Sequence, residues 1–137
     1  MRTIRNDGLV RIDVDVEQSL ITSQWKGYVP SDEYRAALWQ ILEQVREHKL
    51  SLWLSDTREM GIILRADEKW SMEVFVPELM KHGLRRVGLV QSQDYFTQTV
   101  TERLAEATVA VAPFKVEMFS SAELALGWLA KELEALV

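Results

Sequence analysis

Hydrophobic and polar residues alternate near the start of the chain with the period of two that is typical of β-strands. In the segment 9–16 the apolar residues all fall on one face, namely Val10, Ile12, Val14 and Val16. The segment 20–25 reads as a second strand, and its better division points Ile21, Ser23 and Trp25 inward. Because only residues 17–19 connect the two segments, we expect an antiparallel hairpin.

From residue 31 onward, a spacing of three and four residues replaces the alternation and predicts helices. The first helix is expected to begin with Ser31 as its capping residue and to end near His48. A second helix is expected to begin near Ala66 or Asp67. Pro77 lies within it and lacks a backbone N–H, so the helix should kink or break there.

Three short apolar segments between the helices are predicted to be further strands, over residues 50–55, 86–91 and 114–119. A third helix follows residue 94, and its predicted buried stripe consists of Phe96, Val100, Leu104 and Ala107. A last helix begins at the capping sequence 120–123. The order is therefore ββαβαβαβα, and strands joined through helices should be parallel with right-handed crossovers.

The predicted strands alternate, whereas the strands of a parallel sheet covered on both faces are apolar throughout. The positions opposite the apolar sets are Arg11, Asp13 and Asp15, then Ser51, Trp53 and Ser55, and finally Lys115 and Glu117. We therefore expect an α/β fold with a mixed sheet, helices mainly on one face, and the other face largely open.

Composition narrows the possible functions. The 137 residues are expected to form a single domain over residues 1–137. A net charge of −5 argues against a nucleic-acid partner, and the absence of cysteine excludes disulfides and thiol nucleophiles. No apolar run is long enough to cross a bilayer, and the N-terminal residues do not resemble a signal peptide. We expect a cytoplasmic protein without membrane insertion.

Several short motifs occur in an order that resembles a known family. They are Trp25 and Gly27, the sequence Leu-Ser-Asp-Thr-Arg at 54–58, Trp70, the strand 86–90, and 119–123 leading to Ala125, Trp128 and Leu129. Over nearly the whole chain this pattern is similar to the STAS fold of bacterial anti-anti-sigma factors. More narrowly, it resembles the small single-domain bacterial proteins called STAS/Sec14-like or SpoIIAA-like. The resemblance implies that fold and no particular activity.

One departure from anti-anti-sigma factors concerns phosphorylation. Those proteins carry a phosphoacceptor Ser or Thr in a turn before the second helix. At the corresponding place this chain reads Leu64-Arg65-Ala66-Asp67, which contains no hydroxyl group. A phosphorylation switch on this turn is therefore not expected.

The end of the strand at 50–55 is a candidate ligand site, because open parallel sheets bind ligands at the carboxyl ends of their strands. Asp56 and Thr57 lie there, and Arg58 and Arg65 would form a small anion pocket beside a helix N-terminus. Alternatively, Asp56 only accepts hydrogen bonds from backbone amides of its own loop.

Two of the five tryptophans, Trp39 and Trp53, fall on positions predicted to face solvent. Exposed tryptophan often marks a contact surface, so we expect a partner protein or a second copy of the chain to pack there. No arrangement typical of a catalytic, cofactor or metal site is found. The leading interpretation is a non-enzymatic regulatory or scaffolding domain that acts through protein–protein contacts.

The alternative is a domain that binds a small molecule or lipid, most simply an acyl chain under the helix containing Pro77. Flexible apolar residues would line that site, namely Met60, Ile62, Ile63, Leu64, Met72, Phe75 and Met80.

Overall fold

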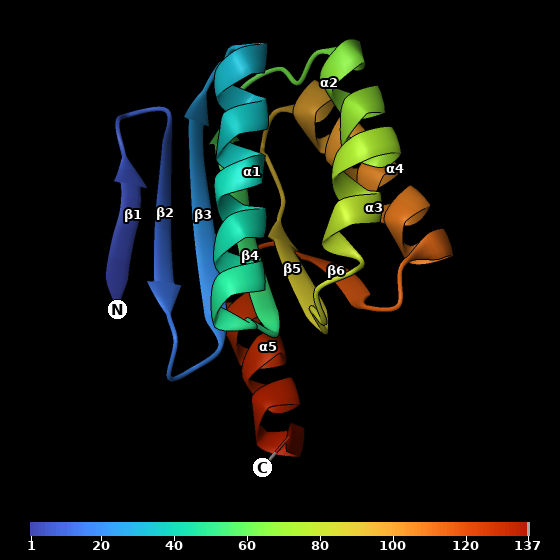
Figure 1. Ribbon diagram of the computed structural model, residues 1–137. Coiled ribbons are helices and arrows are strands. Elements are labelled where there is room, and N and C mark those ends of the chain that lie inside the picture. Colours follow the sequence, from blue (N-terminus) through green and yellow to red (C-terminus); the bar gives the residue numbers. More distant parts are fainter. Residues whose placement is uncertain (137) are drawn as a thin grey trace.

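The computed structural model describes residues 1–136, and a six-stranded sheet forms its centre (Figure 1). The strands are β1 (Arg2–Asn6), β2 (Val10–Asp15), β3 (Leu20–Gly27), β4 (Leu52–Met60), β5 (Arg86–Val90) and β6 (Lys115–Phe119). They lie side by side in sequence order. The pairs β1–β2 and β2–β3 are antiparallel, and the pairs from β3 to β6 are parallel.

The helices cover the two faces of the sheet unequally. They are α1 (Ser31–His48), α2 (Arg65–Trp70), the π-helical segment η1 (Ser71–Phe75), α3 (Val76–Leu79), α4 (Tyr95–Val111) and α5 (Ala122–Leu136). Helices α1 to α4 pack on one face, and α5 packs on the other (Figure 1). The predicted fold class is confirmed: a mixed α/β sheet with an antiparallel hairpin, parallel strands and helices mainly on one face.

The predicted kink at Pro77 takes the form of a π-helix. The chain stays helical from Arg65 to Leu79, but the backbone N–H of Val76 donates to the carbonyl of Ser71, five residues earlier. Pro77 lies in the first turn of α3, where its missing N–H costs least. Single π-helical turns of this kind often accompany functional sites.

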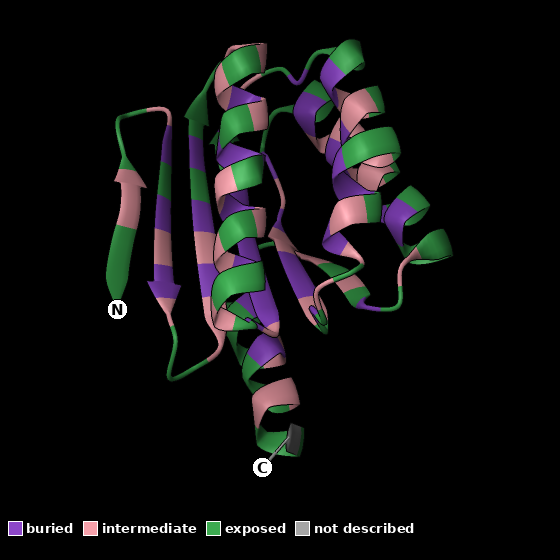
Figure 2. Cartoon of the chain, viewed as in Figure 1, coloured by how far each residue is buried: buried purple, intermediate pink, exposed green. Residues whose placement is uncertain are grey.

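Strand β4 is the centre of the molecule because both of its faces are buried. Trp53 belongs to the larger core beneath α1 and η1, together with Ile21, Trp25 and Phe75. Leu52 and Leu54 belong to a smaller core under α5, whose other members are Val90, Ala125 and Leu129. In Figure 2 buried positions run along the central strands.

The prediction that Trp53 faces solvent is wrong. Its side chain is 7% exposed, and its indole N–H donates to Ser23 Oγ at 3.0 Å. The alternation of leucines with other residues in β4 predicts one apolar face and one solvent-facing face. In the structure, α5 covers the leucines and η1 covers the tryptophan, so both faces are buried. A buried indole needs a hydrogen-bond acceptor, and Ser23 on β3 provides it.

The open face exists, but only over the antiparallel part of the sheet. On the side opposite α1, Asp13 accepts hydrogen bonds from Thr3 at 2.6 Å and from Arg11 at 2.9 Å. Helix α5 packs mainly on β4, β5 and β6, and the core under it extends to Leu20 at the start of β3. The polar surface around Asp13 lies beyond these contacts.

Three further expectations differ from the structure. The edge strand β1 was not predicted. The buried face of α4 consists of Thr97, Thr101, Ala105 and Thr108, one position beyond the predicted stripe, and Phe96 is exposed. Ser31 is not a capping residue, because its hydroxyl donates to Asp67 Oδ2 at 2.7 Å. In α4, small and polar side chains take the places that hydrophobicity alone would give to larger ones.

Candidate functional site

Three loops meet at the end of the sheet where the parallel strands finish, the upper end in Figure 1. They follow β3, β4 and β5. The backbone N–H of Gly61 donates to the carbonyl of Gly27 at 2.7 Å, which joins the first two loops. The Thr97 hydroxyl donates to the carbonyl of Gly61 at 2.9 Å, which joins the second loop to the first turn of α4. These bonds hold the three loops together.

Large apolar side chains project into solvent from the first two loops and from the first turn of α4. We define the carboxyl-end rim as Tyr28, Ile62, Leu64, Tyr95 and Phe96, each between 41% and 73% exposed. The rings of Tyr95 and Phe96 lie 5.8 Å apart in an edge-to-face arrangement. Soluble proteins rarely gather exposed side chains of this size without a binding role.

The backbone beneath the rim leaves little room for change. A Cβ atom at Gly61 would lie 3.0 Å from backbone atoms of Gly27 and Tyr28, so a larger residue would separate the two loops. Asp94 caps α4 by accepting from the backbone N–H and the hydroxyl of Thr97, both at 2.9 Å. The backbone hydrogen bond from Thr97 is the main reason why the pKa of Asp94 is lowered. The rim is therefore a fixed surface.

The predicted site residue Asp56 is paired within its own strand. Arg58 Nε and Nη2 donate to the two carboxylate oxygens at 3.0 and 2.6 Å, and the Arg58 backbone N–H donates to Oδ1 at 3.1 Å. Burial raises the pKa of Asp56, but the hydrogen bonds from Arg58 outweigh it and hold the pKa below its ordinary value. An incoming anion would have to compete with Asp56 for this guanidinium group.

Thr57 and Arg65 point to other places. Thr57 is buried, and its hydroxyl donates to the carbonyl of Val90 at 2.6 Å. Arg65 is exposed on α2 and lines a surface hollow between α2 and α4 with Glu68 and Arg103. The structure thus brings Asp56 and Arg58 together but does not bring Arg65 into the same pocket. A ligand role for these four residues stays a prediction.

Trp39, the other predicted interface residue, is 37% exposed on α1. Its ring packs edge-on against Trp70 at 5.4 Å and against Phe75 at 6.2 Å. Part of its surface therefore serves the core, and its role in an interface stays a prediction.

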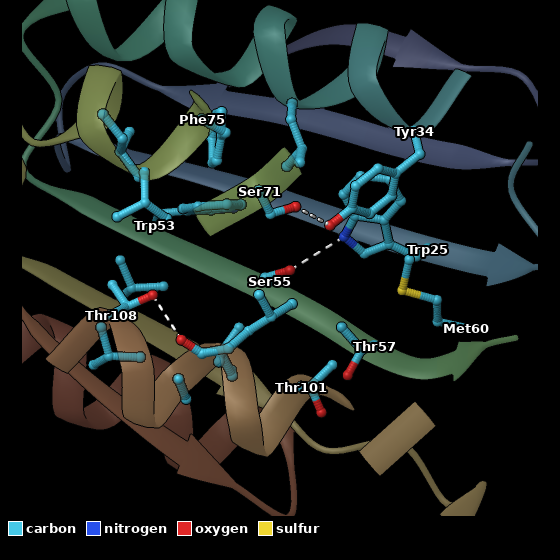
Figure 3. Close-up of a pocket in the computed structure, with 18 of the residues that line it drawn as sticks. Trp25, Tyr34, Trp53, Ser55, Thr57, Met60, Ser71, Phe75, Thr101 and Thr108 are labelled. Carbon is cyan, nitrogen blue, oxygen red and sulfur yellow. Dashed lines mark hydrogen bonds between the residues drawn. The ribbon is translucent and has the colours of Figure 1, made fainter. Parts of the chain in front are cut away.

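An interior cavity of about 110 Å³ lies between the sheet and the helices η1 and α4 (Figure 3). Its lining is mainly apolar and includes Trp25, Trp53, Leu79, Leu104 and Phe114. Two of the residues expected to line an acyl-chain site, Met60 and Phe75, line this cavity. Two others, Ile62 and Leu64, are exposed on the rim instead.

Sequence reasoning missed most of the rim. Phe96 was assigned to the buried stripe of its helix, and Tyr28 and Tyr95 were not singled out. A usable signal was present, since Tyr95 and Phe96 directly follow a capping aspartate and therefore lie in the first turn of the helix, next to the loops.

Comparisons with known proteins agree with this geometry. No protein-family model matches the chain. An uncharacterized protein of the DUF3478 family with a SpoIIAA-like fold, from Shewanella loihica PV-4, superposes with a TM-score of 0.58 at 18% sequence identity. The alignment covers 91% of this chain and 97% of that chain. The chain has a SpoIIAA-like fold.

A second solved structure with the SpoIIAA-like fold comes from Pseudomonas aeruginosa. It is SiaC, the activator in a complex with the diguanylate cyclase SiaD. The TM-score is 0.51 at 18% identity, and the alignment covers 85% of this chain and 96% of that chain. The predicted resemblance in fold is confirmed by both structures.

Among curated sequences, autophagy-related protein 11 of Kluyveromyces marxianus is 30% identical over 85 residues, which make up 62% of this chain. The chain spans 8% of the length of that protein. Across residues 1–136, no helix is both long enough and apolar enough to cross a membrane. The same part of the chain contains no group of three His, Asp or Glu side chains able to hold a metal ion.

Proposed function

We propose that this chain is a non-enzymatic regulatory domain that binds a different protein through the carboxyl-end rim. The observation that carries the proposal is the exposure of five large apolar side chains on two loops and the first turn of α4, which hydrogen bonds fix to one another. Aromatic side chains on a rigid support are the usual anchors of protein interfaces, since they bury a large area at a small cost in conformational entropy.

The partner that fits this surface presents an apolar groove for the Tyr95–Phe96 pair. The residues that border the partner's groove should be basic, because this chain carries a net charge of −5. The fold is put to a regulatory use in SiaC, which is an activator in complex with another protein. That parallel is an analogy of fold, and it favours a partner of a different kind over a second copy of the chain. A bacterial, cytoplasmic setting is part of the proposal.

The test compares two double variants of helix α4. Tyr95→Ser with Phe96→Ser removes the aromatic pair of the rim, and Val109→Ser with Val111→Ser removes two exposed valines from the other end of the same helix. Each version of the chain is immobilised and exposed to a cell lysate. Proteins retained by the wild type and by the valine variant, but not by the rim variant, are identified and purified. Each purified protein is then titrated against all three versions of the chain. We expect the rim variant to raise their Kd by about tenfold or more.

Two results would overturn the proposal. The first is that both variants retain the same proteins with the same affinity. The second comes from sedimentation of the purified chain: a wild-type dimer that dissociates in the rim variant would make a second copy the occupant of the rim. Far-UV circular dichroism of both variants confirms that each is folded.

A further inference from the structure

Buried side chains form most of the wall of the interior cavity. Sixteen of the residues that line it are in the buried class, and Leu89, Leu104 and Val116 are partly exposed. Its volume of about 110 Å³ is somewhat below the 150 Å³ or so of an engineered apolar cavity that binds benzene. A space of this size holds one small ring or a short branched hydrocarbon, and it is too small for a long acyl chain.

The polar groups around the cavity already have partners. Trp25 Nε1 donates to Ser55 Oγ at 3.1 Å, and the hydroxyls of Tyr34 and Ser71 lie 2.8 Å apart (Figure 3). The threonine hydroxyls donate hydrogen bonds to backbone carbonyls. Thr57 donates to Val90, Thr101 donates to Thr97, and Thr108 donates to Leu104. A molecule inside would meet mainly hydrocarbon and aromatic rings, and none of the lining residues carries a charge that could pair with a charged ligand.

The cavity exists because α4 turns small side chains toward the sheet. Thr101, Ala105 and Thr108 stand in a row on the helix, and opposite them the π-helical turn η1 displaces Phe75 and Ser71 from regular helical positions. Protein interiors are normally packed without voids of this size, because an empty space forfeits dispersion contacts. Leucine at position 105 would fill the space, yet the chain carries alanine.

Leu104 marks the route by which a ligand enters. It lines both the interior cavity and the surface hollow between α2 and α4. On the opposite wall, Met72 lines the hollow and lies 3.6 Å from the Thr108 hydroxyl, which lines the cavity. Rotation of the Leu104 side chain would therefore connect the two spaces.

We propose that the cavity binds a compact, uncharged, apolar molecule of about the size of a benzene ring, admitted past Leu104. This inference is independent of the rim, so each proposal can fail without the other. The probe is benzene, titrated into the full chain while the methyl resonances of Leu38, Leu79 and Val87 are followed by NMR. These residues line the cavity, whereas Leu124 and Leu126 on the outer side of α5 serve as internal references.

Matched variants locate the binding. Ala105→Leu fills the cavity, and Ala110→Leu adds the same atoms to an exposed position of the same helix. We expect saturable shifts at the cavity methyls in the wild type and in Ala110→Leu, and binding weaker by about tenfold or more in Ala105→Leu. Leu104→Ala should speed the exchange of benzene, because it removes the side chain between hollow and cavity.

Three results would overturn the proposal. One is the absence of saturable shifts in the wild type, and another is equal affinity in the two alanine variants. The third is a response to octanoate as strong as that to benzene, which would mean that the site takes a longer, charged molecule. If Ala105→Leu does not fold, Ala105→Val with Val87→Ile narrows the same space from both walls and replaces it.

Discussion

The Tyr34 hydroxyl shows how single residues hold the helical layer together. It lies 2.8 Å from Ser71 Oγ, and Ser71 in turn donates to the backbone carbonyl of Asp67 at 2.8 Å. The Asp67 carboxylate accepts from Ser31 at 2.7 Å and from Arg35 at 3.0 Å. Helix α1 is thus fastened to α2 and η1 by a buried polar network with every member paired, an arrangement that strengthens such groups.

This network predicts a late tyrosine titration. Burial raises the pKa of Tyr34 to about 12, and the charges of Asp67 and Glu68 add to that effect, while the hydrogen bond with Ser71 opposes it. A folded pKa above the ordinary value of 10.0 stabilises the fold below pH 10, and this contribution is lost as the pH rises toward 12. Absorbance at the phenolate band should show a component near pH 12 that is missing in Tyr34→Phe.

The free energy of unfolding supplies a second check on Tyr34. Between pH 10 and 12 it should fall more steeply in the wild type than in Tyr34→Phe. Equal slopes in the two proteins, or a late absorbance component that persists in the variant, would contradict the assigned role of Tyr34.

At the scale of elements, helix α5 depends on its fit against β5. A Cβ atom at Gly88 would lie 3.4 Å from Ala125 Cβ and 3.5 Å from Leu129 Cδ1, so the helix rests directly on the strand backbone. Arg86 adds a second contact, since its guanidinium lies 4.6 Å from the centre of the Trp128 ring and donates to the Trp128 carbonyl at 2.8 Å. Close packing of this kind leaves no room for a branched side chain at position 88.

Two glycines near this contact should therefore respond in opposite directions. A Cβ atom at Gly127 on α5 would meet nothing within 4 Å, so Gly127→Ala should stabilise the protein by about 0.5–1 kcal/mol through helix propensity. Gly88→Val should destabilise it by about 1–3 kcal/mol, because the valine methyls collide with α5. Urea denaturation of both variants measures these changes, and a destabilised Gly127→Ala would show that α5 is held differently.

At the scale of the whole molecule, the sheet separates two cores that share one strand. Trp53 and Leu54 are neighbours in β4, yet one belongs to the core under α1 and η1 and the other to the core under α5. Loss of either layer exposes one face of this central strand to water. The two cores are therefore expected to lose their packing together.

The expected result is one cooperative unfolding transition over the whole chain. Trp25 and Trp53 report on the larger core, while Trp128 packs against Phe119 at 5.5 Å in the smaller one. In the wild type and in Trp128→Phe alike, the midpoint of urea denaturation followed by tryptophan fluorescence should agree with the midpoint followed by far-UV circular dichroism. An earlier transition that disappears in Trp128→Phe would mean that α5 detaches by itself.

Much of the fold could be predicted from local patterns. The alternation at 9–16 and the helical spacing after residue 31 correspond to observed elements, and the irregularity expected at Pro77 corresponds to the π-helical segment just before it. The pattern did not predict strand β1, because its residues, Arg2 to Asn6, are polar enough to resemble a free terminus. The site was harder to predict, since the rim consists of residues from three separate loops whose proximity depends on the hydrogen bonds of Gly61.

The sequence by itself determined the order of strands and helices, because periodicity records which positions must avoid water. Only the tertiary structure decided which face of β4 each helix covers: α5 returns across the sheet and buries the leucines, so Trp53 became a core residue. It also decided that Phe96 is exposed and that Ala105 borders a cavity. These properties depend on what lies opposite a residue in space, and a single sequence does not record that neighbour.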